Sequence, residues 1–552
     1  MTNALLSVHD VAVSYHTRRG VVPAVSGVNF AVYPGEITAI VGESGSGKST
    51  TAMAAIGLLP ESASVDAGSI TFAGLDVTRL NASQWRALRG ARIGLVPQDP
   101  NNSLNPQKTI GAALEEGMVI HGRYDAAERK RRAIEWLDKV GITEPARRYH
   151  QYPHELSGGM KQRVLIAAAL ALEPELIIAD EPTSALDVTV QKTILDLLDE
   201  LRAETGVGIL FITHDLAVAG DRANHVVVME KGQVRESGNA VAVLTNPQHP
   251  YSQRLLAHAP SLVVDDDELV PGAPGTSSVS SVAVEGKPLV QVRGLSQRFG
   301  DFQAIADISF DVAKGSTHAL VGESGSGKTT TGRAIALFNT PSAGTIDVGG
   351  VDITAVGDKE RRELRRNIQL VYQNPYSSLN PRMQIGDIIA EPVRNFTGAS
   401  KAAAARRAQE FLELVALDPA LYTRKPAELS GGQRQRVAIA RAMIVEPELV
   451  ILDEAVSALD VTVQAQILRL LDKLQQELDL TYIFISHDLA VVRQISDTVS
   501  VLHRGRQVER GVTREVFAHP QSPYTKQLID AIPGARYRSG ARYRSGALNL
   551  GL

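Results

Sequence analysis

A glycine-rich stretch at residues 41–50 most constrains what this 552-residue chain can fold into. It reads Val-Gly-Glu-Ser-Gly-Ser-Gly-Lys-Ser-Thr, and it follows a short apolar run that predicts a buried strand. Its glycines allow a tight turn, so that backbone N–H groups and the start of the next helix can face an anion. Lys48 supplies a positive charge for phosphate groups, and the Ser49 hydroxyl suits Mg²⁺. The stretch therefore predicts a P-loop, the phosphate-binding turn between a strand and a helix.

The P-loop recurs at residues 321–330, where nine of ten residues are identical, so a chance Gly/Ser-rich turn does not explain it. In both halves a Ser-Gly-Gly motif precedes an Asp-Glu pair by 23 residues, and the Asp precedes a histidine by 34 residues. Equal spacings of this kind indicate an internal repeat. We expect a first domain at residues 1–263 and a second at residues 288–534. Residues 264–287, rich in Asp, Pro, Gly and Ser, predict a flexible linker, and residues 535–552 a disordered basic tail.

Composition excludes several classes of protein. The chain has 44% hydrophobic and 21% charged residues, as ordinary soluble proteins do. A formal charge of −4 gives no sign of a nucleic-acid-binding surface. The absence of cysteine excludes disulfides, thiolate-bound zinc and ordinary iron–sulfur clusters. No apolar run reaches the ~18 residues of a spanning helix, and no signal peptide is evident. We expect a cytoplasmic protein that reaches a membrane only through a partner.

Alternation of buried strands and helices around each P-loop predicts an α/β domain with a mainly parallel sheet, and the hairpin-rich N-terminal part adds an antiparallel β-subdomain. In the first half, strands are expected at residues 5–15, 28–32, 37–41, 93–97, 176–179 and 209–213, with a hairpin at 68–78. Helices are expected at residues 51–59, 83–89, 126–140, 164–172 and 188–203.

Polar residues follow several of these strands, where ligands bind in open α/β sheets. Asp180 emerges from an apolar run and can hold Mg²⁺ through water, and Glu181 can orient and deprotonate an attacking water. His214 can reach a terminal phosphate, and Gln98 offers an amide to the metal or the water. Each alone has a structural explanation, but their recurrence in the same order favours catalysis. The counterparts in the second half are Gln373, Asp453, Glu454 and His487.

Two further motifs carry a family resemblance. Residues 156–163, Leu-Ser-Gly-Gly-Met-Lys-Gln-Arg, and residues 429–436, Leu-Ser-Gly-Gly-Gln-Arg-Gln-Arg, resemble the signature of ATP-binding-cassette (ABC) ATPases. The order P-loop, glutamine, signature, Asp-Glu and histidine is similar to that family over nearly the whole chain. The resemblance implies tandem ABC domains, each with an α-helical subdomain, and ATP and Mg²⁺ as ligands. It also implies two composite sites within one chain, in which each P-loop faces the signature of the other half.

The resemblance assigns roles residue by residue. Tyr15 and Phe299, which core packing alone would explain equally well, would stack on adenine, and Asp187 and Asp460 would lie where the halves meet. The nucleotide would contact, in the first half, Tyr15, Gly42, Ser44, Gly45, Gly47, Lys48, Ser49, Thr50, Gln98, Ser157, Gly158 and Gly159. In the second half the nucleotide residues would be Phe299, Gly322, Ser324, Gly325, Gly327, Lys328, Thr329, Thr330, Gln373, Ser430, Gly431 and Gly432. The metal residues would be Ser49, Gln98, Asp180, Thr329, Gln373 and Asp453, and the catalytic residues Glu181, His214, Glu454 and His487.

The glutamine loops at 98–106 and 373–381 resemble those of the dipeptide, oligopeptide and nickel importer branch. So do the tail elements His-Pro-Tyr-Ser at 249–252 and Ser-Pro-Tyr-Thr at 522–525. Met160 resembles a D-type signature and Gln433 an F-type one, so the chain is similar to a fused, DppD-like importer ATPase. A cysteine cluster that is common in this branch cannot form here.

The resemblance implies an ATPase that powers peptide import from the cytoplasmic face of a bacterial membrane. Its partners would be two permeases and an extracytoplasmic substrate-binding lipoprotein. Nickel, glutathione or a peptide antibiotic are alternative cargoes. A tandem ABC protein acting on the ribosome and a drug exporter are the rival classes. The acidic linker disfavours the first rival, and the glutamine loops and tail elements disfavour the second.

Overall fold

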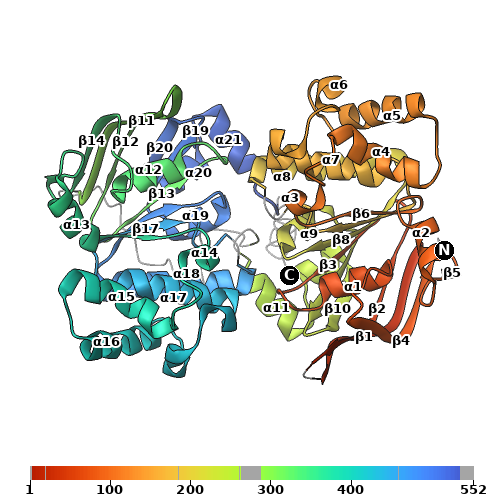
Figure 1. Ribbon diagram of the computed structural model, residues 1–552, viewed down its shortest axis with the longest axis horizontal. Helices are drawn as coiled ribbons and strands as arrows, with labels where there is room; N and C mark the ends of the chain where they lie inside the picture. The colour runs from red at the N-terminus through yellow and green to blue at the C-terminus, as the bar shows by residue number, and fades with distance from the viewer. Residues whose placement is uncertain are drawn as a thin grey trace, which may run out of the picture. The chain divides into compact units, whose positions relative to one another are not determined.

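In the computed structural model of the chain, each P-loop lies between a strand and a helix, as its sequence predicts. The structure describes residues 3–18, 20–183, 186–259, 262, 288–457 and 459–534. The predicted linker at 264–287 and tail at 535–552 lie outside the described residues. The described chain forms two compact units, a first unit built from the N-terminal half and a second built from residues 288–532 (Figure 1).

The first unit alternates strands and helices. Its strands are β1 (Leu6–Thr17), β2 (Gly20–Val32), β3 (Ile37–Val41), β4 (Ala63–Phe72), β5 (Leu75–Asp76), β6 (Ile93–Val96), β7 (Leu176–Asp180), β8 (Gly208–Thr213), β9 (His225–Glu230) and β10 (Gln233–Asn239). Its helices are α1 (Lys48–Ala55), α2 (Ala82–Leu88), α3 (Pro100–Ser103), α4 (Ile110–Ile120), α5 (Ala126–Lys139), α6 (Pro145–Arg148), α7 (Gly158–Leu170), α8 (Val188–Thr205), α9 (Leu216–Arg222), α10 (Ala240–Thr245) and α11 (Pro250–Ala257).

The second unit repeats this order. Its strands are β11 (Val290–Phe299), β12 (Phe302–Val312), β13 (Thr317–Val321), β14 (Ala343–Val348), β15 (Val351–Asp352), β16 (Ile368–Val371), β17 (Leu449–Asp453), β18 (Thr481–Ile485), β19 (Thr498–His503) and β20 (Arg506–Val512). Its helices are α12 (Lys328–Ile335), α13 (Asp358–Asn367), α14 (Pro375–Ser378), α15 (Ile385–Thr397), α16 (Lys401–Leu414), α17 (Gly431–Met443), α18 (Val461–Leu478), α19 (Leu489–Ile495), α20 (Thr513–Ala518) and α21 (Pro523–Asp530).

Each unit has a mainly parallel central sheet. The strand order is β10-β9-β3-β8-β7-β6 in the first unit and β20-β19-β13-β18-β17-β16 in the second, with β10 antiparallel to β9 and β20 antiparallel to β19. In the second unit β20 also pairs in parallel with β12, which joins this sheet to the β-subdomain. Antiparallel strands β2-β1-β4-β5 and β12-β11-β14-β15 form the β-subdomains. Helices α4 to α7 and α15 to α17 pack on one another as α-helical subdomains. The predicted α/β fold class is confirmed.

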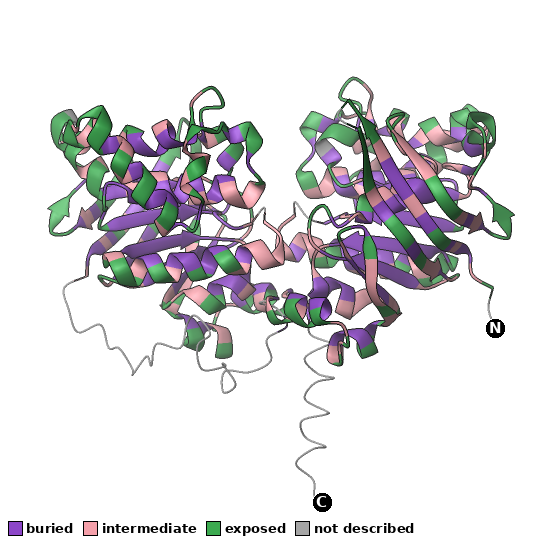
Figure 2. Ribbon diagram, turned by 90° about the horizontal axis from the view of Figure 1, so that it is seen from below, coloured by how far each residue is buried: buried purple, intermediate pink, exposed green. Residues whose placement is uncertain are grey.

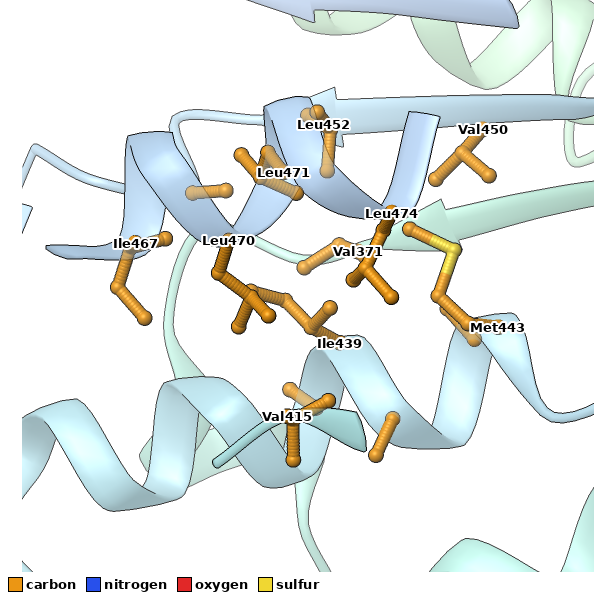
Figure 3. Close-up of a cluster of buried hydrophobic side chains, with 14 of the residues drawn as sticks. Val371, Val415, Ile439, Met443, Val450, Leu452, Ile467, Leu470, Leu471 and Leu474 are labelled. Atoms are coloured by element: carbon orange, nitrogen blue, oxygen red, sulfur yellow. The ribbon is translucent and has the colours of Figure 1, made fainter. Parts of the chain in front are cut away.

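The central strands are buried along their whole length. Every residue of β3, β7, β8, β13, β17 and β18 is buried, which is typical of parallel strands covered by helices on both faces (Figure 2). Figure 3 shows how helices cover one face in the second unit: Ile439 and Met443 of α17 and Leu474 of α18 belong to one buried cluster with Val450 and Leu452 of β17. Continuous apolar strands therefore hold the P-loop at the edge of a rigid core.

Helix boundaries differ from the sequence prediction at the signature. Helix α7 begins at Gly158 rather than at residue 164, because the Ser157 hydroxyl caps it by accepting a hydrogen bond from the Met160 amide (3.4 Å). Helix α4 was not predicted. Its glycine at position 111 weakens the helical signal, but the structure requires it, since a Cβ there would lie 2.3 Å from the Tyr149 ring.

A buried histidine distinguishes the second unit from the first. His318 in β13 is 2% exposed and stacks on Phe310 with ring centroids 4.4 Å apart. Its Nδ1 lies 2.8 Å from the Thr498 hydroxyl and its Nε2 3.0 Å from the Ser500 hydroxyl. Burial, reinforced by the charge of Arg510, lowers the pKa of His318 to about 3. The histidine is therefore neutral at physiological pH.

We expect this histidine to make the second unit acid-sensitive. Because its pKa is lower when folded, the unfolded state binds the proton more tightly, and stability falls as pH drops below the unfolded value near 6.5. At pH 5 the loss is about 2 kcal/mol, at ~1.36 kcal/mol per pKa unit. Replacing His318 by Thr, the residue at the equivalent position 38, should remove this part of the pH slope in urea unfolding followed by circular dichroism.

The chain carries an internal control for this measurement. Both tryptophans, Trp85 and Trp136, belong to the first unit, so their fluorescence follows that unit. The fluorescence transition should keep the same pH dependence in His318→Thr and in the unmodified chain. The prediction would be contradicted if the free energy of unfolding measured by circular dichroism had the same pH dependence in the variant as in the unmodified chain.

Candidate active site

The first P-loop is held in shape by its own lysine. Gly47 precedes α1 with a φ of 96°, a conformation that favours glycine. The buried Lys48 side chain donates from Nζ to the carbonyl oxygens of Gly42 (2.8 Å) and Glu43 (2.9 Å). The glycine at 42 is required sterically, since a Cβ there would lie 2.2 Å from the Met229 carbonyl oxygen at the end of β9. The loop is thus fixed between two strands of the sheet.

The second P-loop has the same geometry. Lys328 donates to the carbonyl oxygens of Gly322 (2.7 Å) and Glu323 (2.8 Å), and Gly327 has a φ of 100°. A Cβ on Gly322 would lie 2.1 Å from the Leu502 carbonyl oxygen. The repeat seen in the sequence therefore extends to the individual hydrogen bonds.

The P-loop offers unsatisfied polar atoms and open space to a phosphate. Within the described chain, the buried hydroxyls of Ser46 and Ser326 have no hydrogen-bond partner. A Cβ on Gly45 or Gly325 would meet nothing within 4 Å. An anion that entered this space would meet the backbone N–H groups of a helix start and the lysine. The residues present therefore fit the phosphates of a nucleotide.

Each strand-end aspartate lies beside the P-loop hydroxyl. Asp180, at the end of β7, accepts a hydrogen bond from Ser49 (3.1 Å), and Asp453, at the end of β17, accepts one from Thr329 (3.0 Å). Burial raises the pKa of the Asp180 carboxyl, a rise that Ser49 partly offsets and that Glu181 reinforces. A hydroxyl and a carboxylate at this distance are hard oxygen ligands of the kind that Mg²⁺ prefers.

The next residue in each unit joins a three-residue cluster. Glu181 accepts a hydrogen bond from the Gln98 amide nitrogen (2.9 Å) and lies 3.2 Å from His214 Nδ1. Its φ of 44° places it in the left-handed region, which is uncommon for a side-chain-bearing residue and is a form of strain found at functional sites. In the second unit Glu454 has a φ of 49°. Its carboxylate accepts a hydrogen bond from the Gln373 amide nitrogen (2.6 Å) and lies 3.4 Å from His487 Nδ1.

The charges of this cluster are coupled. Burial acts to raise the pKa of Glu181, but the hydrogen bond and charge of His214 outweigh it, so the pKa lies below its ordinary value. Burial likewise acts to lower the pKa of His214, and Glu181 outweighs it, so that pKa is raised. Glu454 shows the same lowered pKa for the same reasons. Both glutamates are therefore ionised at neutral pH, the form in which a carboxylate can accept a proton.

The aromatic positions differ between the units. Tyr15 near the end of β1 has its hydroxyl 3.3 Å from the Thr50 hydroxyl in α1, so it lies against the P-loop helix. Phe299 at the end of β11 is 51% exposed and pairs across the hairpin with Phe302. An exposed aromatic surface of this kind suits stacking on a base.

The signature motifs begin helices. Ser157 and Ser430 cap α7 and α17, and in the second unit Gln433 also accepts from the Ser430 amide (2.9 Å). A Cβ on Gly158 or Gly431 would meet nothing within 4 Å, so each helix start is open. Asp187 and Asp460 directly precede α8 and α18. Within each unit the structure thus assembles the P-loop, Asp, Glu, Gln and His residues, and it presents the signature as a separate helix start.

One contact that shapes the loop was not predicted from the sequence. The turn after β9 donates from the Gly232 amide to the Ser46 carbonyl oxygen (3.0 Å), and Gly505 makes the same bond to Ser326 (3.1 Å). Both glycines have positive φ and sit close to a neighbouring backbone, so each would resist a side chain. The sequence signal for this contact is a glycine at the same position of each repeat.

The model of the family described as ABC transporter matches residues 25–184 and 305–457, one match in each unit. The chain belongs to the ABC transporter family. Its two P-loop domains are the ATPase domains of that family, which bind ATP. A second model, described as the oligopeptide/dipeptide transporter C-terminal region, matches this ABC protein at residues 235–288 and 508–547. No helix in the described ranges is both long enough and apolar enough to cross a membrane.

Curated relatives match this ABC protein almost end to end. The peptidoglycan transport ATP-binding protein YejF of Agrobacterium fabrum is 45% identical over 96% of each chain. The glutathione import ATP-binding protein GsiA of Salmonella choleraesuis is 42% identical, over 96% of this chain and 90% of GsiA. The oligopeptide transport ATP-binding protein OppD of Mycobacterium tuberculosis is 40% identical, over 96% of this chain and 98% of OppD. The predicted family resemblance is confirmed.

Proposed function

We propose that this chain is the ATP-hydrolysing subunit of an importer for peptides, glutathione-like small peptides included. The observation that carries the proposal is the oligopeptide/dipeptide transporter C-terminal region, which follows each of the two ABC domains. Two of the relatives named above, GsiA and OppD, support the same class of cargo, since oligopeptides and glutathione are both amide-linked chains. The ATPase subunit itself supplies the energy, and the cargo is selected by its partners.

In this proposal both units hydrolyse ATP. Glu181 and Glu454 orient and deprotonate the attacking water, while His214 and His487 hold the glutamates and face the terminal phosphate. Mg²⁺ would be held by Ser49, Gln98 and Asp180 in one site and by Thr329, Gln373 and Asp453 in the other, where it would neutralise phosphate charge. Within the described chain no group of three or more His, Cys, Asp or Glu side chains is arranged to hold a metal ion, so phosphate oxygens would complete the coordination.

The signature motifs indicate how the sites are completed. A capped helix start with an open glycine is an anion-binding element, but the phosphate it needs must come from another domain. We place the P-loop of each half opposite the signature of the other half in the same chain, Lys48 with Ser430 and Lys328 with Ser157. The domain limits at 1–263 and 288–534 follow from the same repeat.

We place the chain on the cytoplasmic face of a bacterial membrane, bound to two permeases that receive cargo from an extracytoplasmic lipoprotein. The isolated chain should then be a weak ATPase. In vesicles that contain the permeases, binding protein and a dipeptide or glutathione, the rate per chain should rise about tenfold or more, which corresponds to ~1.4 kcal/mol of activation free energy.

The matched control contains the same vesicles without cargo. ATPase rates should be measured for the isolated chain, the cargo-free complex and the cargo-loaded complex. Equal rates in all three would contradict the importer and favour an ABC protein that works without a membrane partner.

A further inference from the structure

A tyrosine hydroxyl contacts the P-loop backbone in both units. The Glu43 amide, directly after the first P-loop glycine, donates to the Tyr251 hydroxyl (3.3 Å). The Glu323 amide donates to the Tyr524 hydroxyl (3.1 Å). Each tyrosine is the second residue of the last helix described in its unit, α11 or α21, about 200 residues away along the chain. The same long-range bond, made twice, couples the C-terminal region to the nucleotide site.

A carboxylate fixes the approach of each helix. Glu236 of β10 accepts hydrogen bonds from the amides of Gln248 (2.8 Å) and His249 (3.1 Å), just before α11. Burial opposes its ionisation, but these amide bonds hold the pKa of Glu236 below its ordinary value. A charged acceptor that receives two backbone donors is a strong anchor. It sets where α11 begins and therefore where the Tyr251 ring points.

The second unit has the same anchor. Glu509 of β20 accepts from the amides of Gln521 (2.7 Å) and Ser522 (3.0 Å). The Tyr524 ring also stacks on His503, the last residue of β19, with centroids 4.0 Å apart and ring planes at 19°. The neighbouring carbonyl of Leu502 is the one that Gly322 approaches so closely. Strand end, P-loop and C-terminal helix are therefore packed as one block.

The Glu43 amide is part of a loop that is also held at three of its carbonyl oxygens. Lys48 binds the carbonyls on either side of that amide, and Gly232 binds the Ser46 carbonyl. The tyrosine hydroxyl adds a support at the entry to the loop by accepting this backbone amide. A P-loop that is already in its binding conformation loses less conformational entropy when it binds phosphate.

We propose that Tyr251 and Tyr524 are positioning residues of the two nucleotide sites, each of which holds its P-loop ready for ATP through one backbone amide. The inference rests on the proposed ATPase function. It assigns the C-terminal helices a role in nucleotide affinity, and by linkage bound nucleotide should in turn tighten these helices onto the P-loop.

The test compares Tyr→Phe variants, which lose the hydroxyl but keep the ring. In the full-length chain, Tyr251→Phe with Tyr524→Phe should weaken fluorescent ATP-analogue binding about 3- to 10-fold, the range for one neutral hydrogen bond. The KM for ATP should rise by a similar factor while kcat changes little. The matched control is Tyr482→Phe, which removes a buried hydroxyl bond to the Leu471 carbonyl (3.0 Å) away from the P-loop. It should lower the melting temperature without changing nucleotide affinity.

A site-resolved version uses a chain with one P-loop disabled. In a Lys48→Ala background, Tyr524→Phe should weaken the remaining site and Tyr251→Phe should not. Should a tyrosine variant fail to fold, Glu236→Gln and Glu509→Gln test the same link, because they loosen the anchor and leave the hydroxyl.

The outcomes separate this inference from the proposed function. If the unmodified chain does not bind ATP, the proposed function itself fails. If it binds ATP and the Phe or Gln variants bind equally tightly, with or without a lower melting temperature, the tyrosines are merely structural and the inference is overturned. Weaker ATP binding in the Tyr251 and Tyr524 variants, with unchanged ATP binding in the Tyr482→Phe control, supports it.

Discussion

Replacing Glu181 and Glu454 together with glutamine is expected to lower ATP turnover roughly 10²–10⁴-fold while ATP binding is retained, the usual scale for loss of a general base. Both side chains are ionised at neutral pH, because His214 and His487 hold the pKa of each below its ordinary value. Glutamine keeps the size and can still accept a bond from the neighbouring amide, but it cannot take a proton from water. The change therefore removes the chemistry and spares the shape of the site.

The measurement is steady-state phosphate release together with equilibrium binding of a fluorescent ATP analogue. Glu175→Gln is the matched control, since this exposed glutamate pairs with Arg92 far from the P-loop and its loss should leave turnover unchanged. Retained turnover in the double variant would refute the assignment. If Glu181→Gln alone abolishes turnover and Glu454→Gln does not, the two sites are not equivalent.

A second large effect, on ATP binding, is expected when Lys48→Ala and Lys328→Ala are combined. Each lysine is buried, and each would bind phosphate through a charge-assisted hydrogen bond worth ~1.5–3 kcal/mol. Its loss should weaken ATP binding about 10- to 150-fold and lower turnover with it. The loss also leaves two P-loop carbonyls of each unit without their lysine donor, so some loss of thermal stability should accompany the change.

Surface lysines provide the control. Lys192 and Lys314 are exposed and pair with Asp196 and Asp479, so their alanine variants should bind ATP normally. Titration calorimetry with ATP and magnesium measures the affinity, and thermal melting checks that the chain is folded. Wild-type affinity in the double P-loop variant would show that neither P-loop is the nucleotide site.

Much of the site could be predicted because its residues follow strand ends. Apolar runs before Asp180 and His214 predict parallel strands, and the carboxyl ends of parallel strands meet at one edge. The sequence therefore placed Glu181 near His214 without any knowledge of distances. The sequence offered the Gln98 amide to the metal or the water, and the structure adds a partner that was not predicted, since the Gln98 amide nitrogen bonds Glu181. That choice depends on how a loop folds back over the sheet, which periodicity does not encode.

By itself the sequence determined the duplication, the P-loops, the signature motifs and the family, because each of these rests on local motifs whose order and spacing recur. Only the tertiary structure decided which distant groups share a hydrogen bond. The Tyr251 hydroxyl reaches the Glu43 amide because Glu236 anchors the start of α11, and His318 stays neutral because the second unit encloses it. The physical reason is that motifs and periodicity describe neighbours along the chain. The desolvation of a side chain depends on packing, and so do hydrogen bonds between residues about 200 positions apart. This packing exists only once the sheet and its helices have assembled.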